Sequence, residues 1–241
     1  MIDLQPIPDR LVVMTFDDGP KSQLTVAAPI LQKYGFGATF YITEGLNFLK
    51  DKERYLTWEE VRALHDMGFE IGNHTQHHKN VATQPDDELE ADLIHIDERC
   101  QTYGIPIPET FCYPGYNTST EAVNVLAKRG FNFARRGVAP EYAYNQDGGR
   151  GPAYDPAIHN PLLIPTTGAS GPNWSFDDLL WAIEQAKDGK ITVLTFHGVP
   201  DLDHPWVHTD PEDFQTYMDY LHDQDCTVIA LRDLIHYVNP A

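Results

Sequence analysis

Short apolar segments alternate with amphipathic segments along the chain, and this alternation constrains the fold more than any other feature. Residues 11–16 form an apolar run typical of a buried strand, and residues 24–31 repeat apolar side chains at helical spacing. Similar pairs recur to the C-terminus without a break in composition. Strands alternating with helices predict a parallel sheet with helical crossovers. We therefore expect an α/β fold, an irregular (β/α) barrel of seven or eight units, as a single domain over residues 1–241.

The same patterns give the expected order of elements. The remaining expected strands are residues 37–42, 69–73, 111–113, 131–134, 162–164, 191–196 and 227–230. The remaining expected helices are residues 57–68, 89–100, 121–128, 175–186 and 211–221. Residues 137–160 are rich in Gly, Pro, Tyr and Asp and predict a long loop. Because barrel active sites are built at the C-terminal ends of strands, functional residues are expected just past these segments.

Composition excludes several classes of partner. The net charge of −19, from 17 basic and 36 acidic residues, opposes binding to nucleic acid or anionic membranes. No apolar run is long enough to span a membrane.

The three cysteines show no metal-binding or disulfide spacing. No secretory signal is visible, which predicts a cytoplasmic protein, although a secreted or periplasmic chain without its leader would look the same. The oligomeric state stays open.

Two adjacent carboxylates, Asp17 and Asp18, follow the first strand and precede Gly19-Pro20. Asp-Gly-Pro is common turn chemistry, so the motif alone has a purely structural explanation. At a strand end, however, two carboxylates can divide the work of binding a cation and accepting a proton.

A histidine cluster follows the strand predicted at residues 69–73. His74 and His78 are four residues apart, so on a helical turn they would share a face, whereas His77 would point elsewhere. Such a pair by itself can simply decorate a surface. Together with Asp18 it forms a ligand set suited to Zn²⁺, with Co²⁺, Ni²⁺ or Mn²⁺ as alternatives.

His197 ends the apolar run 191–196. A lone histidine after a strand is usually a satisfied polar side chain. Because this one lies on the same predicted edge as the carboxylates, its position favours a role as general acid. Downstream, His204, Trp206 and His208 could form a wall for a substrate or an ordered loop.

Four segments resemble the polysaccharide deacetylase family, also called the NodB homology domain or carbohydrate esterase family 4. They are, in family order, Thr15-Phe16-Asp17-Asp18-Gly19-Pro20, His74-Thr75-Gln76-His77-His78, Phe111-Cys112-Tyr113-Pro114-Gly115-Tyr116 and Leu194-Thr195-Phe196-His197. The resemblance implies a barrel of the NodB type. It also implies a metal-dependent hydrolase that removes N- or O-linked acetyl groups from a carbohydrate.

By this resemblance, Asp17 is the catalytic base and His197 the acid, while Asp18, His74 and His78 bind the metal. Leu194 would line the pocket for the acetyl methyl group. The other residues expected at the substrate are Tyr113, Pro114, Gly115, Tyr116 and Trp174, and the aromatic rings among them suit the apolar faces of sugars.

Two departures from the family pattern bear on the substrate. Cys112 occupies the position where the family's third motif usually starts with an arginine that orients the base. Arg135 or Arg136, at the end of the next strand, could replace it. The family's motif with Asp and Trp is reduced to Trp174, with no aspartate shortly before it.

These departures keep two alternatives open. Relatives that hydrolyse cyclic amides, or other non-peptide C–N bonds in small molecules, also diverge in the third motif. A carbohydrate-binding protein without turnover would need no acid and base, and the retention of Asp17, Asp18 and His197 argues against that alternative.

Overall fold

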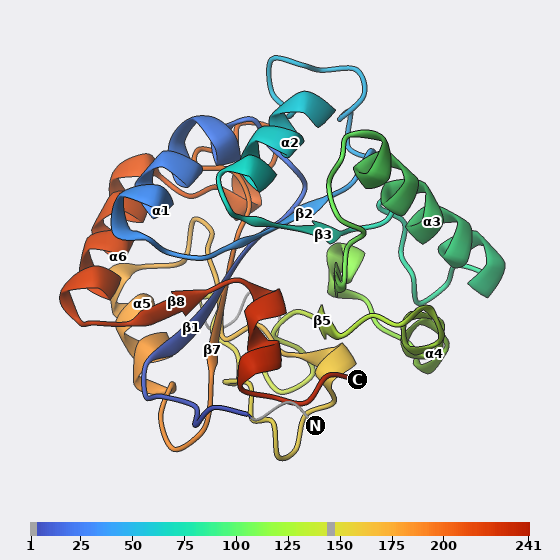
Figure 1. Cartoon of the computed structure of the whole chain (residues 1–241). Coiled ribbons are helices and arrows are strands. Elements are labelled where there is room, and N and C mark those ends of the chain that lie inside the picture. Colours follow the sequence, from blue (N-terminus) through green and yellow to red (C-terminus); the bar gives the residue numbers. More distant parts are fainter. Residues whose placement is uncertain (1–3, 144–147) are drawn as a thin grey trace.

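The computed structural model describes residues 4–143 and 148–241. Its centre is a parallel sheet in the order β5-β4-β3-β2-β1-β7-β6, and β8 also pairs with β1. The strands are β1 (Leu11–Phe16), β2 (Thr39–Ile42), β3 (Glu70–Asn73), β4 (Thr110–Cys112), β5 (Phe133–Arg135), β6 (Gly168–Ala169), β7 (Thr192–Phe196) and β8 (Thr227–Ile229). The sheet curls into a half-barrel, which confirms the expected fold class (Figure 1).

Helices cover the outside of the curled sheet (Figure 1). They are α1 (Ala28–Tyr34), α2 (Trp58–Asp66), α3 (Asp86–Thr102), α4 (Thr120–Arg129), α5 (Phe176–Glu184) and α6 (Pro211–Asp223). Shorter helical turns are η1 (Gln23–Ala27), η2 (Pro114–Tyr116), η3 (Pro161–Leu163), η4 (Pro205–Val207) and η5 (Leu231–His236). The helix starts follow capping chemistry: the Thr57 side chain accepts from the backbone of Glu60, whose carboxylate in turn accepts from the backbone of Thr57.

The alternation of side chains along the strands separates two apolar layers. In β1, Val12, Met14 and Phe16 belong to the cluster packed under the helices, whereas Leu11 and Val13 belong to a second cluster. Because strand side chains alternate, Thr15 continues the series of Leu11 and Val13. At the end of each strand, only side chains that point to the same face of the sheet can therefore contact one another.

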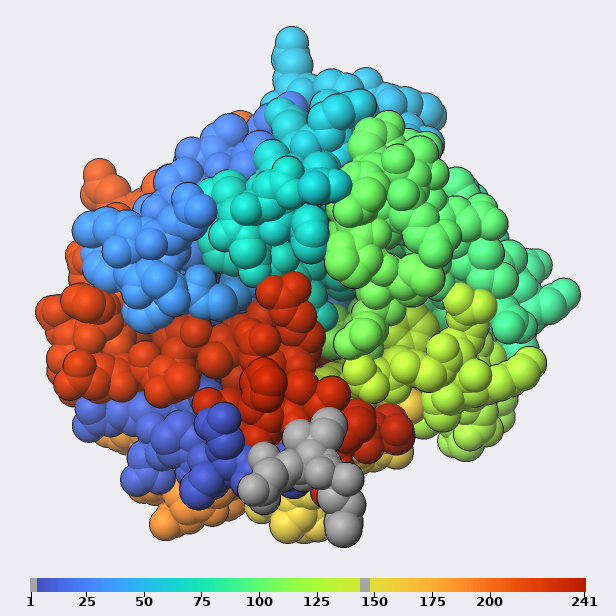
Figure 2. Space-filling model, viewed as in Figure 1, coloured from blue at the N-terminus to red at the C-terminus, as the bar shows by residue number. Residues whose placement is uncertain are grey.

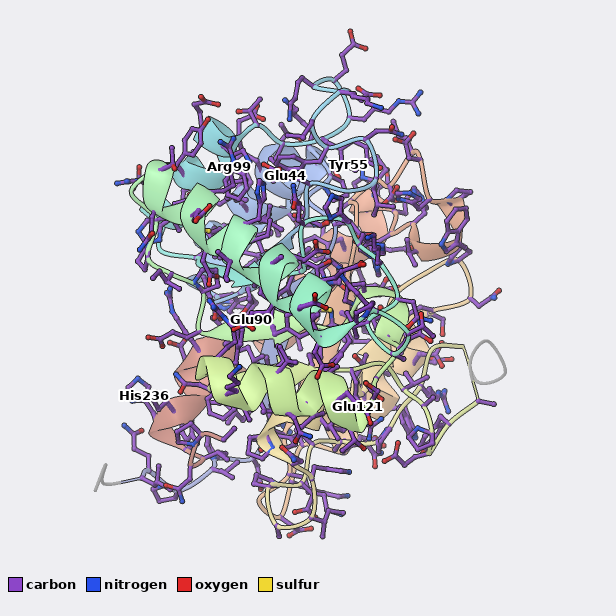
Figure 3. All side chains as sticks on the ribbon, turned by 90° about the vertical axis from the view of Figure 1, so that its right-hand side faces the viewer. Glu44, Tyr55, Glu90, Arg99, Glu121 and His236 are labelled. Carbon is purple, nitrogen blue, oxygen red and sulfur yellow. The ribbon has the colours of Figure 1, made fainter. Side chains whose placement is uncertain are left out.

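Segments that are far apart in the sequence lie side by side on the outside of the molecule. The C-terminal segment, in red, lies between the first described residues, in dark blue, and the light blue and teal segments that follow them in the sequence (Figure 2). On an adjacent side, α3 and α4 lie next to each other (Figure 3). There, Glu44 after β2 is bound by Arg99 of α3 at 3.0 Å and by Trp58 of α2 at 2.7 Å.

One expected strand is wrong. Residues 162–164 were predicted as a strand, but residues 161–163 form η3 and only Ile164 bridges to Arg135. Asn160 caps this turn through the backbone N–H of Leu162. No helix of the described residues is long and apolar enough to cross a membrane.

Candidate active site

A tight turn at the end of β1 presents the two adjacent carboxylates. Asp18 and Gly19 have positive φ angles of 72° and 69°, a conformation that aspartate tolerates better than most residues. The backbone N–H of Asp17 donates to the carbonyl of Phe196 at 3.0 Å, which ties the turn to β7. Gln23 donates to the Asp17 carbonyl at 2.6 Å. Both carboxylates are buried, with Asp17 1% and Asp18 6% exposed.

The two histidines of the second motif come together through a loop, which corrects the expected helical turn. Thr75 and His78 both have positive φ angles, 64° and 54°. Asn73 accepts from the backbone of Thr75 at 3.0 Å, and Thr75 accepts from the backbone of His78 at 3.0 Å. As the sequence predicted, His77 points elsewhere and binds Asp92 at 2.7 Å.

Asp18, His74 and His78 converge on one point. Oδ1 of Asp18 lies 3.3 Å from Nε2 of His74 and 3.2 Å from Nε2 of His78. Nδ1 of His74 faces the carbonyl of Cys112 at 2.7 Å, which directs Nε2 to this point. Two imidazole nitrogens and one carboxylate are a donor set suited to a divalent cation with open coordination positions, so these residues could hold a metal.

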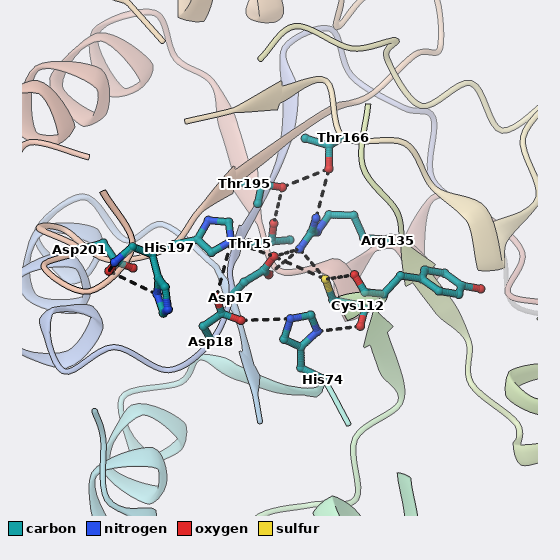
Figure 4. A network of polar contacts seen from close by, with 12 residues as sticks. Thr15, Asp17, Asp18, His74, Cys112, Arg135, Thr166, Thr195, His197 and Asp201 are labelled. Carbon is teal, nitrogen blue, oxygen red and sulfur yellow. Dashed lines mark hydrogen bonds and ion pairs between the residues drawn. The ribbon is translucent and has the colours of Figure 1, made fainter. Parts of the chain in front are cut away.

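Asp17 is paired with an arginine from β5. Nη2 of Arg135 donates to Oδ2 of Asp17 at 2.6 Å and lies 2.7 Å from Sγ of Cys112 (Figure 4). Nη1 of Arg135 donates to Thr166 at 3.2 Å. Arg136 points away and donates to the carbonyl of Leu163 at 3.1 Å. Of the two arginines proposed from the sequence, the structure therefore brings only Arg135 to Asp17.

Burial and charge act in opposite directions on the two carboxyl groups. Burial alone would raise the pKa of Asp17, but the positive charges of Arg135, His74 and His197 outweigh it and lower this pKa. Burial would likewise raise the pKa of Asp18, yet hydrogen bonds from His74 and His78 hold it well below its ordinary value. Both groups are therefore poised to be carboxylates.

His197 follows β7 and faces both carboxylates. Its Nε2 lies 3.8 Å from Oδ2 of Asp17 and 3.9 Å from Oδ2 of Asp18 (Figure 4). Nδ1 is buried, and no described residue bonds to it. The five residues assigned to the metal, the base and the acid thus meet at one cavity.

This cavity has a volume of about 630 Å³. It is lined by Asp17, Asp18, Leu46, His74, His78, Gly115, Tyr116, His197, His204, Trp206 and Val207. Gly115 and Tyr116 therefore lie where the sequence predicted them. The sequence prediction missed Leu46, which no motif marks, and did not include Thr166, which accepts a hydrogen bond from Arg135.

Four predicted substrate residues lie away from this cavity. Tyr113 is fully buried, and its hydroxyl donates to the carbonyl of Leu162 at 2.8 Å. Pro114 is also buried and does not line the cavity. Leu194 and Trp174 are buried in the cluster under the helices. Trp174 lines a second pocket, which shares Tyr116, Trp206 and Val207 with the first.

The polysaccharide deacetylase family model matches residues 5–134. This match covers more than half of the chain, from before β1 to β5, and includes the first three motifs. The chain therefore belongs to the polysaccharide deacetylase family, the carbohydrate esterase 4 or NodB-like group.

Two curated relatives carry related names. The chain is 32% identical over 90 residues to peptidoglycan-N-acetylglucosamine deacetylase of Bacillus cereus, across 37% of this chain and 39% of the relative. It is 26% identical over 153 residues to peptidoglycan-N-acetylmuramic acid deacetylase PdaA of Bacillus subtilis, across 62% of this chain and 56% of the relative. The matches thus span between about two fifths and about half of the relatives' length.

Solved structures share the fold at low sequence identity. The Bc1960 peptidoglycan N-acetylglucosamine deacetylase superposes with a TM-score of 0.66 and 15% identity, over 98% of this chain and 92% of that chain. A carbohydrate esterase 4 pseudoenzyme from Bacillus anthracis superposes with a TM-score of 0.61 and 16% identity, over 98% and 72% of the two chains. The fold thus occurs in proteins described as enzymes and in one described as a pseudoenzyme.

Proposed function

We propose that this chain is a metal-dependent deacetylase that hydrolyses acetyl groups, N- or O-linked, on a carbohydrate. One observation carries the proposal: the Asp17 carboxyl group, paired with Arg135, lies beside the three candidate ligands Asp18, His74 and His78, with His197 at the same cavity. A structural metal site would need neither the buried Asp17–Arg135 pair nor a further imidazole, His197, facing both carboxylates.

The chemistry assigned to the residues follows from their positions. A divalent cation bound by Asp18, His74 and His78 would supply Lewis-acid polarisation of the acyl carbonyl and lower the pKa of a bound water. Asp17 accepts the proton of the attacking water, and Arg135 holds its carboxylate in place. His197 gives a proton to the departing amine or alcohol.

A backbone donor near the cavity can stabilise the negative charge that develops on the acyl oxygen. The backbone N–H of Tyr116 is already donated to the carbonyl of Tyr113 at 2.9 Å. Gly115, in the same turn, lines the cavity. We therefore assign the oxyanion contact to the backbone N–H of Gly115.

Acetylated carbohydrate is the proposed substrate, because the named relatives act on acetylated amino sugars and aromatic rings line the open cavity. Cyclic-amide hydrolysis was motivated by the missing arginine at Cys112. The position of Arg135 weakens that motive, because a guanidinium still binds the base.

Acetate release tests the proposal. Purified protein should liberate acetate from at least one member of a panel of N-acetylglucosamine oligomers and acetylated xylose oligomers. The same panel should include cyclic amides and imides. Ring opening of one of these without acetate from any sugar would replace the carbohydrate proposal, and no turnover of any compound would favour a pseudoenzyme.

Metal content tests the ligand assignment separately. We expect about one divalent ion per chain, Zn²⁺ first, in protein purified without chelator, because three protein ligands leave room for water. The His74→Ala/His78→Ala double variant should lose the ion in elemental analysis. A double variant with full metal content would place the site elsewhere.

The two aspartates should separate metal binding from turnover. Asp17→Asn should retain the metal and lose turnover, because an amide cannot accept the proton. Asp18→Asn should lose metal affinity. Metal loss in the first variant, together with turnover in the second, would reverse the two roles.

A further inference from the structure

The loop that follows His197 holds a buried carboxylate. Asp201 is only 4% exposed. It accepts backbone hydrogen bonds from Gly198 at 3.2 Å, Asp203 at 3.1 Å and His204 at 2.8 Å. Three such bonds fix the position of its carboxylate relative to β7. In Figure 4, Asp201 lies on the side of His197 away from Arg135.

Asp201 in turn orients an imidazole at the cavity. Nδ1 of His204 is buried and lies 3.6 Å from Oδ1 of Asp201. Interaction with this carboxylate raises the pKa of His204 above its ordinary value, against the opposing effect of burial. His204 is one of the residues that line the catalytic cavity. The family motifs assign no role to His204.

Trp206 stands next to this imidazole. Its ring centroid is 5.3 Å from that of His204, and the side chain is 68% exposed, unusually high for a tryptophan. Trp206 lines both the catalytic cavity and the adjoining pocket. An exposed aromatic face beside an oriented polar group is the combination that a sugar ring requires, with one apolar face and hydroxyls at its edge.

We propose that His204 and Trp206 together bind the sugar ring that carries the acetyl group. Trp206 packs against an apolar face of the ring, and Nε2 of His204 exchanges a hydrogen bond with a ring hydroxyl. A hydroxyl can accept from a protonated imidazole or donate to a neutral one, so the contact survives a change of protonation. Asp201 is a positioning residue for His204. This inference rests on the proposed carbohydrate substrate.

His208 differs from His204 although it belongs to the same loop. Its Nδ1 faces the carbonyl of Asp201 at 3.2 Å, and its side chain does not line the cavity. Of the three aromatic residues that the sequence offered as a substrate wall, only His204 and Trp206 therefore face the catalytic cavity.

Two substrates separate sugar binding from catalysis. One is the best acetylated oligosaccharide of the panel, and the other is vinyl acetate, an activated acetyl ester with neither a sugar nor an aromatic ring. His204→Gln and Trp206→Ala should each lower kcat/KM for the oligosaccharide by about tenfold, mainly through KM. Both should lose less kcat/KM for vinyl acetate than for the oligosaccharide, because vinyl acetate has no sugar ring to bind. Leu202→Ala, an exposed apolar residue of the same loop, is the control and should behave as wild type on both.

A binding measurement keeps this inference separable from the proposed function. Protein stripped of metal is titrated calorimetrically with the same oligosaccharides, and affinity should fall about tenfold in both variants. Wild-type binding without acetate release would reject the deacetylase proposal and leave the sugar site supported. Equal losses on both substrates, or unchanged values on both, would overturn the sugar-binding role of His204 and Trp206.

Discussion

At the scale of single residues, the alternating direction of side chains along a strand explains which of the residues predicted from the sequence contact Asp17. Cys112 and Arg135 are paired partners in β4 and β5, and both side chains contact Asp17. Tyr113 and Arg136, one position further along, point away. Leu194 and His197 are three positions apart, so their side chains point to opposite faces of the sheet. The sequence could predict that Asp18, His74 and His78 meet, because the C-terminal ends of parallel strands lie at one edge of the sheet. The direction of each side chain depends instead on whether its position along the strand is odd or even.

Arg135→Met should lower kcat/KM for acetate release by about 10²-fold, because Asp17 loses its charge-assisted partner and its fixed orientation. Arg136→Met is the matched control and should stay near wild type, since Arg136 contacts carbonyls outside the cavity. Steady-state rates at saturating metal measure both. Rates near wild type for both variants would remove Arg135 from the catalytic machinery.

At the scale of elements, the site depends on short connections rather than on the helices and strands themselves. The capping box at Thr57 and the strand of residues 11–16 were readable from sequence, because both rest on local patterns. The loop at residues 74–78 was not, because two left-handed residues bring His74 and His78 together where helical spacing had been assumed. Likewise η3 replaced an expected strand.

Because Cys112 of β4 pairs with Arg135 of β5, exchanging the two residues tests whether the arginine can act from either strand. Arg135→Cys should lose about 10²-fold in kcat/KM, like the methionine variant. The double variant Cys112→Arg/Arg135→Cys returns a guanidinium to the same side of the neighbouring strand and should recover at least about tenfold of that loss. Activity of the double variant no higher than that of Arg135→Cys would mean that the base requires a guanidinium from β5 specifically. Thermal unfolding of each variant controls for misfolding.

At the scale of the whole molecule, the end of the sheet opposite the site is held by one buried carboxyl group. Glu70 of β3 is 3% exposed and accepts hydrogen bonds from Thr39 of β2 and Thr110 of β4, both at 2.6 Å. It also accepts from the backbone of Arg232 in η5 at 2.9 Å. No sequence motif marked this residue, because a glutamate within a strand usually faces solvent. Glu70 therefore joins three strands to the C-terminal segment.

This carboxyl group should make stability depend on pH. Burial raises the pKa of Glu70 above its ordinary value of 4.5, although its hydrogen bonds oppose the shift. Because the folded chain then binds this proton more tightly than the unfolded chain, the contribution of Glu70 to the free energy of unfolding is largest below pH 4.5. It falls as pH rises through the raised pKa.

Glu70→Gln removes that titration while retaining an acceptor oxygen for one threonine. The free energy of unfolding of the variant, minus that of wild type, should therefore increase as pH rises from below 4.5 to neutrality. Urea unfolding followed by circular dichroism at several pH values measures this difference. The contributions of the other titrating groups are the same in both proteins and cancel. Glu184→Gln, at an exposed glutamate, is the matched control for the loss of one negative charge. A difference for Glu70→Gln that stays constant with pH would mean that Glu70 has the same pKa in the folded and unfolded chains.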